Sequence, residues 1–410
     1  MKLFRTLISF DEALKTVLSH VKRTETEEIK FDDAFGRVLA EDVLSPIDSP
    51  PFDRAAMDGY AIRGENSFGA APHSPVSLKL QKRLTAGEEI GDGVCLPIAT
   101  GMPLPRGSNA VVMLEYTKER GDILDIFKPV TPGKNVSLKG EDVKKGEAVQ
   151  KAGKLLRAHD IGMLASLFQR TVKVHKRAKI GIISTGDELL DPAAQSSEQT
   201  QGHEEQKIAD ANSYILAALT RKIAEPYRIG IVRDNYEAIT NALRTLLEGD
   251  GCDGLLVSGG SSVGTRDFLS DAVEDSGELI FHGVAIRPGE PVGFGLINAK
   301  PVFVLPGYPV ATIAAYELLV RPFLYAMHGV TEEGWRIPAT ARKKIPSAVG
   351  RTDFVRVKLF RTESGYYVEP LRVSGSGILS SMTKSDGFVV IEENKEGIAE
   401  GERVEVIGYA

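Results

Sequence analysis

The chain has 410 residues, of which 42% are apolar and 26% are charged. This length and apolar content indicate about two to four globular domains and argue against global disorder. The formal net charge of −6 argues against a broadly basic nucleic-acid-binding protein. No apolar stretch approaches the ~18 residues of a membrane-spanning helix, so we expect no membrane partner. The two cysteines, Cys95 and Cys252, form no CxxC pair, which argues against a disulfide framework and favours a cytoplasmic location.

The first part of the chain predicts one helix, a strand-rich stretch and a second helix. Residues 9–22 predict a helix, because Ser9 and Glu12 have the spacing of a capping box and apolar side chains follow at helical spacing. Residues 45–150 place Gly and Pro between short apolar runs, which is typical of short strands joined by turns. Residues 155–168 predict the second helix.

The second part predicts an α/β region followed by a strand-rich end. In residues 178–327, short apolar strands alternate with helical stretches, which predicts a mostly parallel sheet with helices on both faces. Residues 193–206 contain no large apolar side chain, and we expect a flexible surface loop there. Residues 335–410 return to strands and Gly-rich turns, which predict a small closed or nearly closed β-barrel.

Four predicted strands of the α/β region each end in a polar turn, namely 185–188, 233–235, 259–267 and 307–309. Ligands of open α/β sheets bind outside the carboxyl ends of the strands. Glycines in such turns let backbone N–H groups approach an anion, the start of a helix at Pro309 favours an anion, and nearby carboxylates could hold Mg²⁺. Each turn alone could be an ordinary surface turn, but four in one sheet predict a binding site. No GxxxxGK[ST] motif is present, so the site is not an ordinary nucleotide-binding P-loop.

A second unusual stretch, residues 45–62, combines several prolines with Asp53 and Asp58. Proline fixes the backbone, which suits the wall of a site. A rigid interdomain linker remains the alternative interpretation of this stretch.

Seven motifs together resemble one family. They are AMDGYA, TGMPLPRGSNAVVM, KGEDV, STGDEL, SGGSSVGTRD, RPGEPVGFG and LPGYPVA. They occur in the order found in the MoeA family of molybdopterin molybdotransferases, which is similar to the C-terminal half of gephyrin. The resemblance implies a multidomain α/β plus β fold. Its parts are an elongated N-terminal and linker module (1–45 with 140–176), a β-rich module (46–139), a doubly wound MogA-like molybdopterin-binding domain (177–327) and a C-terminal β-barrel (328–410).

The resemblance also implies a function. The family inserts molybdenum from molybdate into adenylylated molybdopterin, uses Mg²⁺ and releases AMP, late in molybdenum-cofactor synthesis. It is a homodimer, and its site lies between the α/β domain of one subunit and the β-rich module of the other. A MogA-like adenylyltransferase and molybdoenzymes are the expected partners.

By the same resemblance and the strand-end argument, the expected catalytic residues are Asp58, Thr100, Asp142, Glu188 and Asp267, with Glu188 and Asp267 as Mg²⁺ ligands. The expected cofactor-binding residues are Thr185, Gly186, Asp234, Ser258, Gly259, Gly260, Ser262, Gly264, Arg287, Pro306, Gly307 and Pro309.

Four positions depart from the family pattern, namely Ala55, Ser261, Tyr308 and Glu290. Glu290 stands where a lysine is common and would reverse a local charge, which Arg287 could compensate. The departures keep open a paralogue that uses tungstate or a diverged pterin binder without turnover. Two further alternatives have other grounds: a MogA-like adenylyltransferase shares the α/β domain and the SGG-containing turn, and a non-catalytic dimeric pterin-binding scaffold is suggested by the resemblance to gephyrin.

Overall fold

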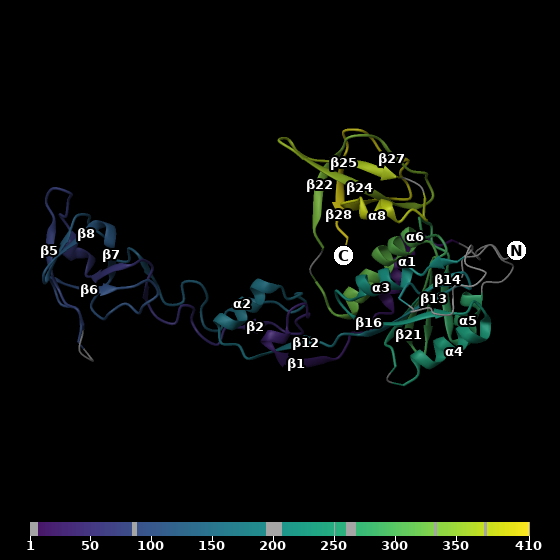
Figure 1. Cartoon of the computed structure of the whole chain (residues 1–410), viewed down its shortest axis with the longest axis horizontal. Helices are drawn as coiled ribbons and strands as arrows, with labels where there is room; N and C mark the ends of the chain where they lie inside the picture. The colour runs from purple at the N-terminus through teal and green to yellow at the C-terminus, as the bar shows by residue number, and fades with distance from the viewer. Residues whose placement is uncertain are drawn as a thin grey trace.

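The molecule is elongated (Figure 1). The computed structural model describes residues 7–83, 88–193, 207–249, 251–259, 268–331, 334–372 and 375–409. A β-rich module forms one end, a linker module lies in the middle, and the α/β domain and barrel lie together at the other end. This arrangement separates the predicted site residues of the β-rich module from those of the α/β domain within one chain.

Helix α1 (Phe10–Ser19) confirms the first predicted helix, and the Ser9 side chain accepts a hydrogen bond from the Glu12 amide at its start. Its buried stripe, Ala13 and Val17, belongs to the core of the α/β domain, where α1 contacts α7 (Arg321–Met327). We expected α1 to belong to the linker module (1–45 with 140–176) instead. A terminal amphipathic helix shows which face it buries but not which neighbour covers that face.

The linker module is built from two antiparallel strand pairs and one helix around a small core. Strand β1 (Thr26–Lys30) pairs with β12 (Thr171–His175), and β2 (Val43–Leu44) pairs with β11 (Ala148–Gln150). Helix α2 (Ala158–Ser166) confirms the second predicted helix in a shorter form. The short helix η1 (Phe31–Asp33) packs beside α2.

The β-rich module contains a six-stranded sheet in the order β7-β4-β6-β5-β9-β8. Its strands are β4 (Gly59–Ile62), β5 (Val76–Leu80), β6 (Val94–Ile98), β7 (Ala110–Met113), β8 (Thr117–Arg120) and β9 (Ile123–Ile126). Short helices η2 (Gly64–Ser67) and η3 (Leu114–Tyr116) and a separate pair, β3 (Arg54–Ala55) with β10 (Val136–Ser137), complete it. The pair β3–β10 connects the Asp58 segment to the loop that carries Asp142.

The α/β domain has a six-stranded sheet in the order β16-β13-β17-β21-β20-β18. The first four strands are parallel, as predicted, and are β16 (Glu225–Val232), β13 (Lys179–Thr185), β17 (Gly254–Ser258) and β21 (Lys300–Leu305). The antiparallel strands β18 (Glu278–His282) and β20 (Gly293–Ile297) at one edge were not predicted. Strand β20 begins with the sequence Gly-Phe-Gly, and because glycine has a low propensity for strands, the sequence did not indicate a strand there.

Helices cover both faces of this sheet. On one face lie α3 (Asn212–Thr220), α1 and the continuous helix α6–η5–α7, made of Pro309–Ala315, Tyr316–Val320 and Arg321–Met327. On the other lie α4 (Tyr236–Leu247) and α5 (Phe268–Ser276). The helix Pro309–Met327 is long and apolar enough to span a membrane by composition, contrary to our sequence expectation, but 78% of its apolar window is buried. It is therefore a core helix in this fold.

A short parallel pair, β14 (Leu189–Leu190) with β15 (Ile208–Ala209), flanks the segment predicted as a surface loop. Residues 194–206 of that segment lie outside the described residues.

The barrel domain confirms the prediction of a closed β-barrel. Its strands are β22 (Arg336–Ala341), β24 (Thr352–Thr362), β25 (Gly365–Arg372), β26 (Gly387–Ile391) and β28 (Arg403–Ile407), and pairing of β24 with β26 closes the ring. The pair β23 (Ile345–Pro346) with β27 (Gly397–Ile398) and helix α8 (Ser380–Thr383) lie beside it. Strand β19 (Ile286–Arg287) of the α/β domain pairs with β24, which ties the two domains together.

Candidate active site

Three neighbouring parallel strands bring polar residues together at their carboxyl ends. Strand β13 ends at Thr185 and β17 ends at Ser258. Gly259 directly follows β17. The Gly259 amide donates to the Leu305 carbonyl at the end of β21 over 3.2 Å. A Cβ on Gly259 would lie 2.2 Å from Thr185 Oγ1, and its φ is +136°. Only glycine permits this approach, so Gly259 joins the three strand ends by close packing.

Asn212, which the sequence analysis missed, connects two of these strand ends. Its Nδ2 donates to Ser258 Oγ over 2.7 Å and to the Gly307 carbonyl over 2.8 Å. The Gly307 carbonyl can only accept a hydrogen bond, so it must face the Nδ2 atom of Asn212 and not Oδ1. This contact fixes which way the Asn212 side-chain amide is turned. Among the described residues, Asn212 Oδ1 and Thr185 Oγ1 are both buried without a hydrogen-bond partner. We call Thr185, Ser258, Gly259, Asn212 and Gly307 the strand-end cluster.

A buried carboxylate, also missed from the sequence, holds the start of α3 against β13. Asp210 is 1% exposed and accepts from Ser184 Oγ over 2.8 Å, from the Ser213 amide over 3.0 Å and from Ser213 Oγ over 2.6 Å. A carboxylate at a helix N-terminus is favoured by the helix dipole. The Asp-Ala-Asn-Ser sequence before an apolar run is a signal for this helix start and could have identified Asp210.

Glu188 lies beside the strand-end cluster, in the turn after β13. A Cβ on Gly186 would lie 2.8 Å from both carboxylate oxygens of Glu188, so the carboxylate folds back over that turn. The other expected Mg²⁺ ligand, Asp267, lies outside the described residues, as do Gly260, Ser261, Ser262 and Gly264. The described part of the chain contains no group of three His, Cys, Asp or Glu side chains suited to a metal. One carboxylate still fits Mg²⁺, which proteins often hold with one or two carboxylates and the phosphates of the substrate.

The first turn of α6 is hydrogen-bonded to the barrel domain. Pro309 has no N–H, and the Val310 amide donates to the Ser376 carbonyl of the barrel over 3.0 Å. The Pro306 carbonyl accepts from Thr312 Oγ1. The Val310 N–H at the start of α6, which we expected to face an anion, is therefore bonded to the neighbouring domain.

Two other expected binding residues have partners in the chain. The Arg287 guanidinium donates to Asp353 of the barrel, which is 1% exposed and also accepts from Ser347 Oγ over 2.7 Å. Arg287 thus forms an ion pair between two domains. The Asp234 amide donates to the Asp187 carboxylate over 3.3 Å, which places it beside the turn that carries Glu188.

The β-rich module brings Asp58 and Thr100 together. Asp58 Oδ1 accepts from the Thr100 amide over 2.7 Å and from Thr100 Oγ1 over 2.8 Å. These two hydrogen bonds lower the pKa of Asp58, because they stabilise the charged form. Asp142 lies in the loop after β10, where its amide donates to the Ser49 carbonyl over 3.0 Å.

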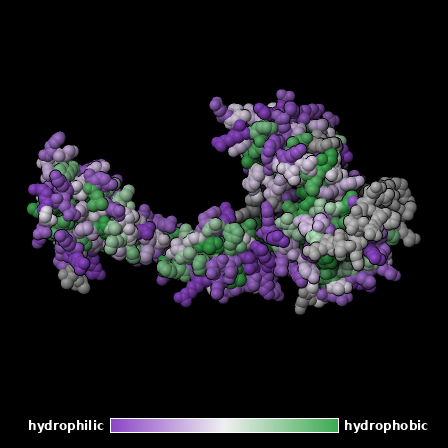
Figure 2. All heavy atoms as spheres, in the orientation of Figure 1, coloured by the Kyte–Doolittle hydropathy of each residue, from purple (hydrophilic) through white to green (hydrophobic). Residues whose placement is uncertain are grey.

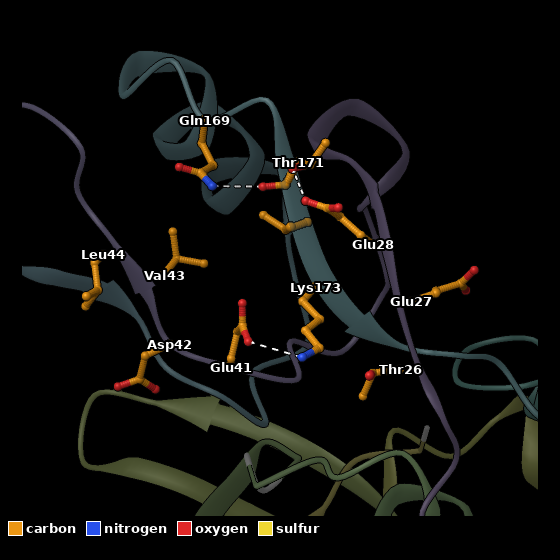
Figure 3. A pocket seen from close by; sticks show the side chains of 11 residues that line it. Thr26, Glu27, Glu28, Glu41, Asp42, Val43, Leu44, Gln169, Thr171 and Lys173 are labelled. Atoms are coloured by element: carbon orange, nitrogen blue, oxygen red, sulfur yellow. Dashed lines mark hydrogen bonds and ion pairs between the residues drawn. The ribbon is translucent and has the colours of Figure 1, made fainter.

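A cavity of about 560 Å³ lies elsewhere, in the linker module (Figure 3). Its walls carry Glu27, Glu28, Glu41, Asp42 and Lys173. Lys173 lies 3.5 Å from Glu41, and Glu28 accepts from a threonine hydroxyl in the same wall. Lys173, Glu41 and Glu28 therefore have partners within the wall of the cavity. None of the expected site residues lines this cavity.

Three family models match consecutive parts of the chain. "MoeA N-terminal region (domain I and II)" matches residues 8–168, "Probable molybdopterin binding domain" matches residues 181–326, and "MoeA C-terminal region (domain IV)" matches residues 338–409.

Similar proteins cover almost the whole chain. A Methanocaldococcus jannaschii protein whose name places it in molybdopterin biosynthesis is 41% identical over 99% of both chains. A molybdopterin molybdenumtransferase of Haemophilus influenzae is 32% identical over 98% of both chains. The crystal structure of the molybdopterin biosynthesis moeA protein from Pyrococcus horikoshii OT3 has a TM-score of 0.83 and 36% identity, covering 98% of this chain and 100% of that chain. The chain therefore belongs to the MoeA family.

Proposed function

We propose that this protein is a molybdopterin molybdenumtransferase. It takes adenylylated molybdopterin and molybdate, inserts molybdenum into the dithiolene of the pterin and releases AMP. The relatives that bear this name cover 98% of the chain, so the proposal extends to the whole protein. Cytoplasmic location, supply of substrate by a MogA-like adenylyltransferase and delivery to molybdoenzymes are parts of the same proposal.

The observation that carries the proposal is the strand-end cluster. Its buried polar atoms, Thr185 Oγ1 and Asn212 Oδ1, lie where open α/β sheets bind their ligands. A pterin offers ring N–H groups and a carbonyl, which such atoms are suited to recognise. Glu188 adjoins the cluster and would hold Mg²⁺ together with the pyrophosphate of the substrate. The ion would neutralise charge at the bond that is cleaved.

We infer that a second copy of the chain completes the site. Thr100, which holds Asp58, follows β6, and Glu188 lies between β13 and β14. Figure 1 shows β6 at one end of the elongated molecule and β13 and β14 at the other. Met57, Met102 and Leu114 around Asp58 are 44%, 54% and 50% exposed. Figure 2 shows hydrophobic residues at the surface of both the β-rich and the linker modules. A two-fold dimer would cover this apolar surface and bring Asp58 to the strand-end cluster of the partner.

Within that site, Thr100 is a positioning residue. It orients Asp58 and keeps it ionised through its two hydrogen bonds. An ionised Asp58 can accept a proton or a hydrogen bond from the substrate that is bound to the facing α/β domain.

The direct test follows AMP release and molybdenum retention by the purified protein. We expect AMP release from adenylylated molybdopterin only when molybdate and Mg²⁺ are both present, and we expect molybdenum to remain on the pterin. AMP release without molybdate, or no release at all, contradicts the proposal. Repeating the assay with tungstate tests the tungstate-using alternative, and incubation of unmodified molybdopterin with ATP tests the adenylyltransferase alternative.

A further inference from the structure

Tyr308 is an exposed aromatic residue at the edge of the strand-end cluster. It lies in the turn between β21 and α6, directly after Gly307, whose carbonyl is held by Asn212. Tyr308 is 60% exposed. Among the residues that the structure describes, its ring makes no contact with another aromatic ring or with a cation.

The backbone on both sides of Tyr308 is fixed. The Tyr308 carbonyl accepts from the Thr312 amide over 2.9 Å and from Thr312 Oγ1 over 3.1 Å. Pro309 follows with its restricted φ. Since neighbouring atoms hold this turn from both sides, the position of the Tyr308 Cα is set before any ligand binds.

The barrel domain supports one side of the Tyr308 ring. A Cβ on Gly377 would lie 3.4 Å from Cδ1 and 3.6 Å from Cε1 of the ring. The loop that carries Gly377 is itself held to α6, because the Ser376 carbonyl accepts from the Val310 amide. The ring therefore rests on backbone at one edge, while most of its surface stays open.

The contacts of the turn 307–310 indicate which part of a substrate could bind beside Tyr308. The Val310 amide is bonded to the barrel and Pro309 has no N–H, so neither residue offers a donor to a phosphate. A flat, open, supported ring is suited instead to stacking on a heteroaromatic ring, which contributes about 1–3 kcal/mol for a nucleic-acid base.

We propose that the Tyr308 ring is the stacking platform for a heteroaromatic ring of the substrate. This inference rests on the proposed function, because the substrate carries two such rings, a pterin and an adenine. Tyr308 thereby becomes a binding residue of this chain, with the barrel domain as its support.

Binding measurements on the full-length protein test the inference and distinguish the two rings. The probes are AMP, the soluble pterin neopterin, and ribose phosphate as a ligand without a heteroaromatic ring. We expect Tyr308→Ala to weaken binding of AMP or of neopterin about tenfold and to leave the affinity for ribose phosphate unchanged. A loss for AMP would identify adenine as the stacked ring, and a loss for neopterin would identify the pterin. Tyr308→Phe should bind both ring probes like the parent protein. Tyr366→Ala, which removes a 37% exposed tyrosine from the barrel hairpin, is the matched control.

Three results would overturn the inference. Tyr308→Ala could bind both ring probes as tightly as the parent protein, it could lose as much affinity for ribose phosphate as for the ring probes, or it could change only the oligomeric mass. Absence of ring binding by the parent protein would overturn it as well. The turnover assay reports separately on the proposed function. A parent that binds a ring through Tyr308 but never releases AMP would refute the transferase and leave the stacking platform standing.

Discussion

The buried histidine at the end of α7 makes the α/β domain sensitive to acid. His328 is 1% exposed; its Nδ1 donates to the Leu324 carbonyl over 2.7 Å, and its Nε2 accepts from the Ala178 amide over 3.0 Å. Ala178 directly precedes β13, the strand that ends at Thr185. A protonated ring would place an N–H opposite the Ala178 N–H, so the neutral form is required for this contact.

The pKa of His328 is lowered to about 4, chiefly by burial; the charges of Arg177 and Arg37 act in the same direction, and the hydrogen bond to the Leu324 carbonyl partly opposes them. An unfolded histidine has a pKa of about 6.5. Between these two pKa values the unfolded chain binds the extra proton and the folded chain does not, so stability falls as the pH falls through this window. From about pH 7.5 to about pH 5, the loss attributable to His328 is about 2 kcal/mol of unfolding free energy.

Urea unfolding of the parent and of His328→Gln at both pH values measures this loss. The variant cannot titrate at this position, and its amide can supply one donor and one acceptor. We expect a lower free energy of unfolding for the variant at neutral pH, but a pH dependence smaller by about 2 kcal/mol than that of the parent. Equal pH dependence of the two proteins would refute the reasoning.

Three further predictions concern the site and its support. Asn212→Leu should lower the free energy of unfolding by about 1–3 kcal/mol, because the buried Ser258 hydroxyl and the part-buried Gly307 carbonyl both lose their partner. It should also weaken pterin binding, which calorimetry can measure; unchanged stability would contradict the role of the two hydrogen bonds. Thr100→Val removes the hydroxyl hydrogen bond to Asp58 and keeps that of the amide, so the pKa of Asp58 should rise part of the way toward its usual range. The acid limb of the pH–activity profile should then move to higher pH, and an unchanged limb would contradict this coupling. Arg287→Gln should cost about 1–3 kcal/mol, because buried Asp353 loses its hydrogen-bonded cation and keeps only Ser347 Oγ and Arg351 at 3.6 Å. The loss should appear as an earlier thermal transition, and the double variant with Asp353→Asn should recover part of it.

Local patterns in the sequence predict much of this fold. The capping pair at Ser9 predicts α1, and the alternation of strands and helices predicts the parallel strands that end at Thr185 and Ser258. The same patterns place Glu188 at the carboxyl edge of the sheet. These features depend on residues close together in the chain, which periodicity and capping rules describe well.

Long-range contacts account for what the sequence did not predict. The Asn212 side chain meets Ser258 and Gly307 only after the sheet has formed, and the barrel carbonyl that takes the Val310 amide comes from a distant segment. The docking of α1 on the α/β domain has the same origin. No periodicity or local motif reports a contact between elements that are remote in sequence.

If two chains build one site, a mixture of two inactive variants should regain activity. Asp58→Ala and Glu188→Ala would each disable both sites of their own dimer. In dimers that exchange subunits at random in an equal mixture, about a quarter of the sites would combine an intact Asp58 with an intact Glu188 from the partner. We therefore predict that the mixture recovers about a quarter of the molybdate-dependent AMP release. A mixture that is no more active than either variant alone, with exchange verified by mass, would contradict the account.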